Sequence, residues 1–144
     1  MTPTRSRDRI LIVDDEPLSR TALDRILSSD FEVTLVAGPR EAVAQLERCD
    51  FLIVITDEEM PGGSGLKLLE EMGRRYPLVL GILVTGHIDY PSVQDAMRNI
   101  HGATVILKPF EPEALLRQVQ SAATLARVRR STQRLGTTKA NRSL

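Results

Sequence analysis

The sequence predicts an α/β fold in which a five-stranded parallel sheet carries helices on both faces. Short apolar runs rich in β-branched residues alternate with helix-like patterns, and such uninterrupted runs are typical of strands covered on both sides. The alternation favours right-handed crossovers between parallel strands, for which the common order of five strands is 2-1-3-4-5. The four strong runs and one weaker run are residues 10–13, 51–55, 79–84, 103–107 and 31–36.

The weaker run at residues 31–36 mixes polar and apolar residues, and we expect it to form an edge strand. Between the runs, apolar side chains recur with the spacing of one helix face, as they do from Val93 to Ile100. A proline or a small residue stands near the start of each expected helix. The N–H that proline lacks is not needed in the first turn of a helix. These residues are Pro17, Pro39, Ser64 or Gly65, Pro91 and Pro112.

The carboxyl-terminal part differs in charge from the rest of the chain. Residues 1–116 carry 19 acidic and 12 basic residues, a net charge of −7, whereas residues 117–144 carry 7 basic residues and no acid, a net charge of +7. We expect the fifth helix to continue to about Arg130 and the last residues to be loose, because several of them are poor helix formers. The predicted organisation is one domain over residues 1–125, followed by a basic helix extension and flexible tail over 126–144.

The overall composition is that of a soluble globular domain. Of 144 residues, 42% are hydrophobic and 26% are charged, which suits a single domain with a full core. One cysteine, Cys49, excludes an internal disulfide and fits a reducing compartment. No apolar run approaches the roughly 18 residues that a membrane-spanning helix needs. We therefore expect a cytoplasmic protein with no membrane partner.

Polar side chains follow the expected strands at their carboxyl ends. Asp14 and Asp15 follow the first strand and Asp57 follows the third. In the order 2-1-3-4-5 these two strands are neighbours, so the three carboxylates should converge at the edge where α/β sheets bind ligands. Converging carboxylates repel one another, and a hard divalent cation removes that cost. Oxygen ligands favour Mg²⁺ or Mn²⁺.

The same edge carries residues suited to phosphoryl chemistry. Asp15 and Asp57 would each supply a metal oxygen, Asp14 would bind the metal or a metal-held water, and the Glu59 carbonyl could add a ligand. Asp57 could also attack phosphorus as a nucleophile. The lysine and the hydroxyl that follow the last two strands, Lys108 and Thr85, could bind the phosphoryl oxygens. Helix capping or turn formation would explain each residue singly, but the agreement of four strand ends favours one site.

These pieces together resemble the receiver domain of two-component response regulators. The matching segments are residues 10–17, Asp57 with the following 60–62 and 65–66, residues 85–86 and residues 108–110, within a match over about residues 8–125. The resemblance implies a flavodoxin-like fold and transfer of a phosphoryl group, with Mg²⁺, from a histidine kinase or phosphotransfer protein to Asp57. It also implies that Asp14 and Asp15 form the acidic pair, that Thr85 is the switch hydroxyl and that Lys108 binds the phosphate.

Two positions depart from the family pattern. Three positions before Lys108 the family pattern has an aromatic residue, but this chain has Val105. A valine cannot report phosphorylation by a ring flip. The residue after the switch threonine is Gly86 where many relatives have alanine, and we expect easier access to the acyl phosphate. His87, at the mouth of the crevice, could tune the same access.

The basic extension offers little for nucleic acid. It has no aromatic residue for stacking and no second helix for a helix-turn-helix, so we expect a solvated linker helix and no direct DNA reading. Its apolar positions, among them Leu125 and Val128, would also allow a homodimer.

The sequence thus predicts a signalling switch and not an enzyme, although intrinsic autophosphorylation and autodephosphorylation could accompany it. Phosphorylated Asp57 would change a surface that binds a downstream effector domain or protein. The alternative is a receiver-like protein-binding module that works without phosphorylation, which Val105 makes conceivable. A small-molecule phosphohydrolase fits least well, since no acid–base pair accompanies the phosphoryl site.

Overall fold

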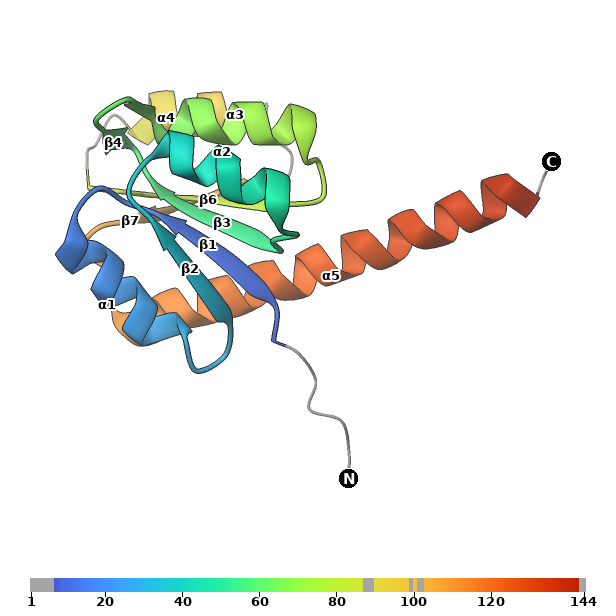
Figure 1. Ribbon diagram of the computed structural model, residues 1–144, viewed down its shortest axis with the longest axis horizontal. Helices are drawn as coiled ribbons and strands as arrows, with labels where there is room; N and C mark the ends of the chain where they lie inside the picture. The colour runs from blue at the N-terminus through green and yellow to red at the C-terminus, as the bar shows by residue number, and fades with distance from the viewer. Residues whose placement is uncertain (1–6, 87–89, 99, 101–102, 143–144) are drawn as a thin grey trace.

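Figure 1 shows the computed structural model of the chain, which describes residues 7–86, 90–98, 100 and 103–142. A sheet of five parallel strands forms the centre, in the order β2-β1-β3-β6-β7. Counted along the chain, this order is 2-1-3-4-5, as predicted. The strands are β2 (Glu32–Val36), β1 (Arg9–Val13), β3 (Ile53–Asp57), β6 (Leu80–Thr85) and β7 (Thr104–Leu107).

Within the described residues, five helices cover both faces of this sheet, which confirms the predicted architecture (Figure 1). Their bounds are α1 (Pro17–Leu27), α2 (Pro39–Arg48), α3 (Gly65–Arg75), α4 (Tyr90–Met97) and α5 (Pro112–Arg142). Helices α1 and α5 share one core with side chains such as Ile10 and Ile12. Helices α2, α3 and α4 share the other core with alternate residues of the same strands, such as Leu11 and Val13. This alternation explains why each strand is a continuous apolar run.

The predicted helix starts are close to those observed. Pro17 and Pro39 occupy the first turns of α1 and α2. Ser64 caps α3, because its side chain accepts a hydrogen bond from the N–H of Lys67. The weaker run forms β2 at the sheet edge, also as predicted.

A small antiparallel hairpin between β3 and α3 was not predicted. It pairs β4 (Glu59–Met60) with β5 (Gly63–Ser64). Gly62 has a φ of 91°, a conformation that glycine adopts without a steric penalty. Gly62 and Gly63 therefore serve the tight turn of this hairpin.

Helix α5 differs from the prediction. We expected it to end near Arg130 with a loose segment after it, but the helix continues to Arg142. Glycine and threonine cost only about 0.5–1 kcal/mol each inside a helix, and extending an existing helix needs no new nucleation. No described helix is long and apolar enough to cross a membrane. The division between 1–125 and 126–144 remains a prediction.

Arginines tie the middle of α5 to the amino-terminal edge of the sheet. Arg127 Nε donates to Asp8 Oδ2 at 2.8 Å, and Arg129 Nη2 donates to the carbonyl oxygen of Pro77 at 3.0 Å. Arg130 donates to Asp50 Oδ2 at 2.7 Å and to the carbonyl oxygen of Phe51 at 2.8 Å. We call these three residues the arginine clamp. Beyond the clamp, α5 projects away from the body of the domain (Figure 1).

Candidate functional site

The pairing of β1 with β3 brings together the acidic residues that the sequence analysis identified at the ends of these two strands. Val13 of β1 pairs with Thr56 of β3, so Asp14 and Asp57 follow side by side. One carboxylate oxygen from each of Asp14, Asp15 and Asp57 lies within 4.8 Å of the others. The expected convergence of the first and third strand ends is therefore observed.

This trio suits a small divalent cation. Mg²⁺ binds oxygens at about 2.1 Å, so two oxygens on one ion lie up to about 4.2 Å apart. The separations among Asp14, Asp15 and Asp57 approach that range. Three carboxylate oxygens form a hard donor set of the kind Mg²⁺ prefers.

Asp14 is the most constrained carboxylate of the trio. Its residue is 2% exposed, and its Oδ1 accepts a hydrogen bond from the N–H of Glu16 at 2.9 Å. Burial raises the pKa of Asp14, the negative charges of Asp57 and Asp15 raise it further, and the Glu16 N–H and Lys108 lower it. Arg20 Nη1 donates to the main-chain oxygen of Asp14 at 2.7 Å, so α1 holds the end of β1 in place.

Asp57 is more accessible and faces a lysine. Its side chain is 20% exposed, and Lys108 Nζ lies 3.6 Å from Asp57 Oδ1. The same oxygen accepts a hydrogen bond from the N–H of Glu58 at 2.9 Å. Lys108 follows β7, whose pairing with β6 continues where the N–H of Lys108 donates to the carbonyl oxygen of Thr85 at 2.9 Å. Thr85 is 3% exposed at the end of β6.

Two further residues shape the segment after Asp57: Glu58, which the sequence did not single out, and Gly65, which it indicated only as a helix start and part of the matched motif. The carboxylate of Glu58 accepts a hydrogen bond from the N–H of Leu66 at 3.1 Å, at the start of α3. Burial raises the pKa of Glu58, while the Leu66 N–H lowers it. A Cβ on Gly65 would lie 2.1 Å from the main-chain oxygen of Asp57, so only glycine fits there. In the sequence, Glu58 looks like one of several solvent-exposed charges after Asp57. Its hydrogen bond with the N–H of Leu66 exists only in the folded chain.

The remaining sequence candidates lie around this centre. A methyl group on Gly86 would contact Lys108 Cβ at 3.4 Å, so the glycine leaves space beside the lysine. Val105 is half-buried in β7, in register with Leu83. Glu59 begins β4 with an exposed side chain, and the role of its carbonyl stays a prediction. His87 lies outside the described residues.

Comparison with known families agrees with this geometry. The family model of the response regulator receiver domain matches residues 10–120. The chain belongs to the response regulator receiver family. Receiver domains are phosphoacceptor switches of two-component systems, and the predicted family is therefore confirmed.

Curated relatives of this receiver domain are transcriptional regulators. The chain is 34% identical over 113 residues to the hydrogenase transcriptional regulatory protein HoxA of Cupriavidus necator, covering 78% of this chain and 23% of HoxA. It is 30% identical over 118 residues to the transcriptional regulatory protein FixJ of Bradyrhizobium diazoefficiens, covering 81% of this chain and 57% of FixJ. The receiver therefore spans about a quarter to just over half of the length of these relatives.

Solved structures share the fold. A CheY-like receiver domain protein of Methanospirillum hungatei superposes with a TM-score of 0.79 at 29% identity, over 86% of this chain and 99% of that one. The response regulator TrrA of Thermotoga maritima, in complex with Mg²⁺ and BeF, superposes with a TM-score of 0.72 at 29% identity, over 80% of this chain and 98% of that one.

Proposed function

We propose that this receiver accepts a phosphoryl group on Asp57 from a histidine kinase or a histidine phosphotransfer protein. The observation that carries the proposal is the acidic trio of Asp14, Asp15 and Asp57 at the carboxyl edge of the sheet, with Lys108 Nζ 3.6 Å from Asp57 Oδ1. Membership of the receiver family supports the same reaction.

In this proposal Mg²⁺ is held by Asp14, Asp15, Asp57 and the main-chain oxygen of Glu59. The bound ion supplies positive charge against the phosphoryl oxygens. The TrrA complex with Mg²⁺ and BeF supports the choice of metal, and the hard donor set of this chain suits it.

The chain's own residues perform the transfer as follows. A carboxylate oxygen of Asp57 attacks phosphorus, an O–P bond forms and the N–P bond of the phosphohistidine breaks. The departing imidazole nitrogen keeps the electron pair and takes a proton from solvent. Lys108 neutralises charge on the phosphoryl oxygens, and the Thr85 hydroxyl donates a hydrogen bond to one of them. Partial burial of the crevice strengthens these interactions.

The resulting change of charge biases the surface that an effector domain or effector protein reads. Because Val105 replaces an aromatic ring, we infer that the response depends on movement of Thr85 and of the backbone that joins it to Lys108, without a ring flip. The protein acts as a switch and not as a metabolic enzyme, and we place it in the cytoplasm with its kinase.

Intact mass spectrometry tests the acceptor. Wild type, incubated with Mg²⁺ and acetyl phosphate or phosphoramidate, should gain the mass of one phosphoryl group. Asp57→Ala should gain none. Glu58→Gln serves as the matched control, because it removes the neighbouring carboxylate and should still be phosphorylated.

The alternative is a binding module that works without phosphorylation, and Val105 is the observation that favours it. Its signature would be no mass gain in wild type together with no Asp57-dependent spectral change on adding Mg²⁺ and beryllofluoride. That outcome would refute the phosphoacceptor proposal.

A further inference from the structure

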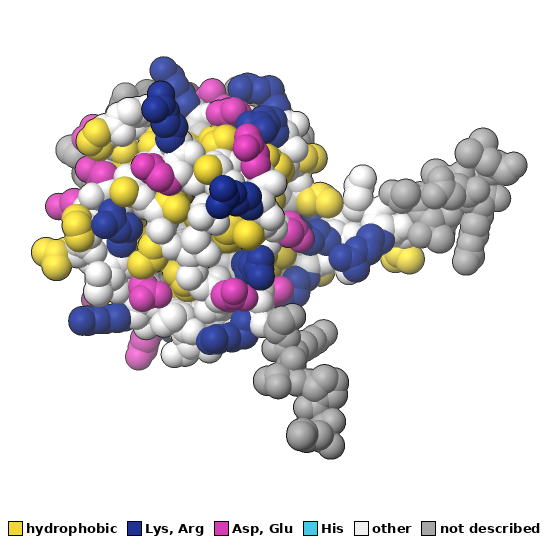
Figure 2. Space-filling model, viewed as in Figure 1, with side chains coloured by type: hydrophobic (Ala, Val, Ile, Leu, Met, Phe, Trp, Pro, Cys, Tyr) yellow, Lys and Arg dark blue, Asp and Glu magenta, His cyan; other side chains and the backbone are white. Residues whose placement is uncertain are grey.

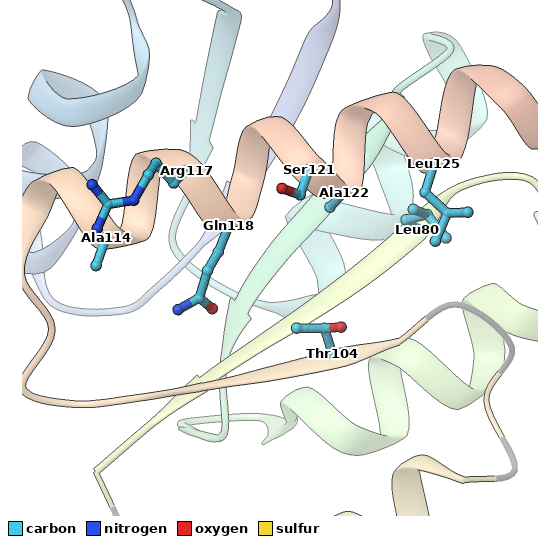
Figure 3. Close-up of a pocket in the computed structure, with 8 residues that line it drawn as sticks. All are labelled: Leu80, Thr104, Ala114, Arg117, Gln118, Ser121, Ala122 and Leu125. Atoms are coloured by element: carbon cyan, nitrogen blue, oxygen red, sulfur yellow. The ribbon is translucent and has the colours of Figure 1, made fainter.

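Two hollows border helix α5, and they differ in charge. One lies between α5 and the strands β6 and β7, with a volume of about 450 Å³ (Figure 3). Among the described residues that line it, only Arg117 is charged. The other hollow has a volume of about 700 Å³ and lies between residues 130–134 of α5 and residues 76–79, which join α3 to β6. We call this second hollow the edge pocket, because it lies at the amino-terminal edge of the sheet.

The edge pocket has a polar wall and an apolar wall. Arg130, Gln133 and Arg134 form the polar wall, and their spacing of three and four residues places them on one side of α5. The 76–79 segment forms the apolar wall with the ring of Tyr76 and three aliphatic side chains. An apolar surface with a few convergent polar groups is typical of small-molecule sites, whose volumes are about 300–1,000 Å³.

The charges that line the edge pocket are unbalanced. Two arginines, Arg130 and Arg134, are accompanied by one carboxylate, that of Asp50. The Asp50 side chain is 76% exposed, so water weakens its pairing with Arg130. Figure 2 shows Lys and Arg side chains where α5 leaves the body of the domain. The pocket therefore favours an anion.

The arginine clamp adds hydrogen-bond donors that the fold leaves unused. Arg130 Nε and Arg129 Nη1 are buried, and neither has an acceptor among the residues that the structure describes. Arg130 lines the edge pocket, and Arg129 donates through its other terminal nitrogen to the carbonyl oxygen of Pro77, which also lines the pocket. Buried charge without a full set of partners is unfavourable, so negative charge placed beside these guanidinium groups stabilises them.

We propose that the edge pocket binds the phosphate monoester of an aromatic molecule, of the size of a nucleoside monophosphate. At neutral pH such a phosphate carries a charge of about −1.5 to −2 and three strong acceptor oxygens. Guanidinium groups bind phosphate through paired hydrogen bonds, which suits Arg130 and Arg134. The apolar wall with Tyr76 suits the aromatic ring.

This site is separate from the phosphoryl site. Asp57 ends β3 at the carboxyl-terminal edge of the sheet, so binding in the edge pocket does not require its phosphorylation. The two walls of the pocket belong to α5 and to the 76–79 segment, so a bound ligand holds the projecting part of α5 to the body of the domain. A ligand stabilises the state that binds it, and amide hydrogen exchange over residues 130–135 should therefore slow.

NMR titration of the ¹⁵N-labelled chain in EDTA tests the site, with adenosine 5′-monophosphate (AMP), inorganic phosphate and adenosine as probes. EDTA prevents the acidic trio from holding a phosphate through a metal ion. AMP should bind with a dissociation constant below about 1 mM and shift the amide signals of residues 78–79 and 130–134. Phosphate and adenosine should each bind at least about tenfold more weakly, because each lacks one of the two groups that the walls contact.

Three charge variants locate the binding. Arg134→Gln should weaken AMP binding about tenfold, because it removes a charged hydrogen-bond donor. Arg117→Gln, the matched change in the hollow of Figure 3, should leave it unchanged. Asp50→Asn keeps an oxygen for Arg130 but removes the negative charge, and it should tighten AMP binding by roughly two- to threefold.

Four outcomes would overturn the proposal. They are no binding of AMP to wild type, inorganic phosphate binding as tightly as AMP, equal weakening by Arg134→Gln and Arg117→Gln, and weaker binding by Asp50→Asn. Exchange over residues 130–135 that AMP does not slow would refute the link to α5. Phosphorylation of Asp57 is measured separately by mass, so its failure would leave this inference intact.

Discussion

Among single residues, Gly65 constrains Asp57, the proposed acceptor, most directly. Its Cα lies against the main-chain oxygen of Asp57, where a Cβ would come within 2.1 Å. Its N–H also donates to the carbonyl oxygen of Glu58 at 2.9 Å. The end of β3 and the first turn of α3 are therefore in direct contact, with no room for a side chain between them.

Replacing Gly65 with alanine should reduce the free energy of unfolding by about 1–3 kcal/mol, because backbone must move to admit the methyl group. Phosphorylation of Asp57 should slow as well. Gly73→Ala, in the same helix, is the control, because its Cβ would meet Ile100 at an ordinary 3.7 Å and should stabilise α3 by up to about 1 kcal/mol. Urea denaturation measures the change in the free energy of unfolding of each variant. Equal stabilities of the two variants would contradict the assigned contact.

Asp14 gives the site a defined dependence on pH. Its folded pKa is raised above the ordinary value of 3.8, so the folded state binds more protons than the unfolded chain in the interval between the two values. The free energy of unfolding contributed by this group therefore falls as pH rises through that interval, and ionised Asp14 destabilises the fold above it.

The variant Asp14→Asn should be more stable than wild type at neutral pH in EDTA, since an amide oxygen can still accept from Glu16 without carrying charge. The difference should shrink as the pH falls toward the ordinary carboxyl range. Thermal denaturation over a pH series in EDTA measures it. A difference that does not vary with pH would show that the charge of Asp14 is not its cause.

Gly86 bears on the lifetime of the phosphoryl group. A methyl group there would contact Cβ of Lys108, the lysine that lies beside Asp57, so Gly86→Ala should slow both phosphoryl entry and hydrolysis by roughly two- to fivefold, the effect of a barrier change below about 1 kcal/mol. Following the decay of the phosphorylated mass after removal of the donor tests this hypothesis, and unchanged rates of both steps would count against it.

At the scale of elements, α5 is held to the sheet by different forces along its length. Its first half is packed by apolar side chains, whereas its middle is fastened by the arginine clamp. Arg130 contributes most to that fastening, since its guanidinium reaches both a carboxylate and a main-chain oxygen. Hydrogen bonds from charged groups are worth about 1.5–3 kcal/mol when they are well shielded.

Arg130→Ala should therefore lower the free energy of unfolding by about 1 kcal/mol. This value is below the range for shielded bonds because Asp50 is exposed to solvent. It should also speed amide hydrogen exchange in α5 from about Arg127 onward. Arg98→Ala removes an exposed arginine pair with Asp95 and should change stability by less than about 0.5 kcal/mol. Faster exchange in α5 of both variants would show that the clamp is not specific.

At the scale of the whole molecule, metal binding should stabilise the fold by mass action. A ligand at 100 times its dissociation constant adds about 2.7 kcal/mol to the free energy of unfolding. Mg²⁺ should therefore raise the melting temperature of wild type, and Asp15→Asn should remove most of that increase. Asp95→Asn, at an exposed carboxylate of α4, should respond to Mg²⁺ as wild type does. An equal response of both variants would place the metal elsewhere.

The sequence predicted the sheet order and the acidic trio because both follow from parallel strands with buried faces. Asp14, Asp15 and Asp57 directly follow or end strands, so the register of β1 and β3 is enough to bring them together. It could not predict the bond from Leu66 to Glu58, which depends on the path of a loop. It also ended α5 too early, because the glycine and threonines after Arg130 are poor helix formers on their own but cost little when they extend an existing helix.

The two ends of the sheet have separate tasks in this molecule. The proposed phosphoryl transfer takes place where the strands finish, whereas the projecting part of α5 departs where they start, about 17 Å away along a five-residue strand such as β3. The arginine clamp fastens α5 at the edge where the strands start, so the projecting part of the helix is held in place at the end of the sheet far from Asp57. A charge added to Asp57 therefore acts first on the loops and helix ends that surround it at the opposite edge.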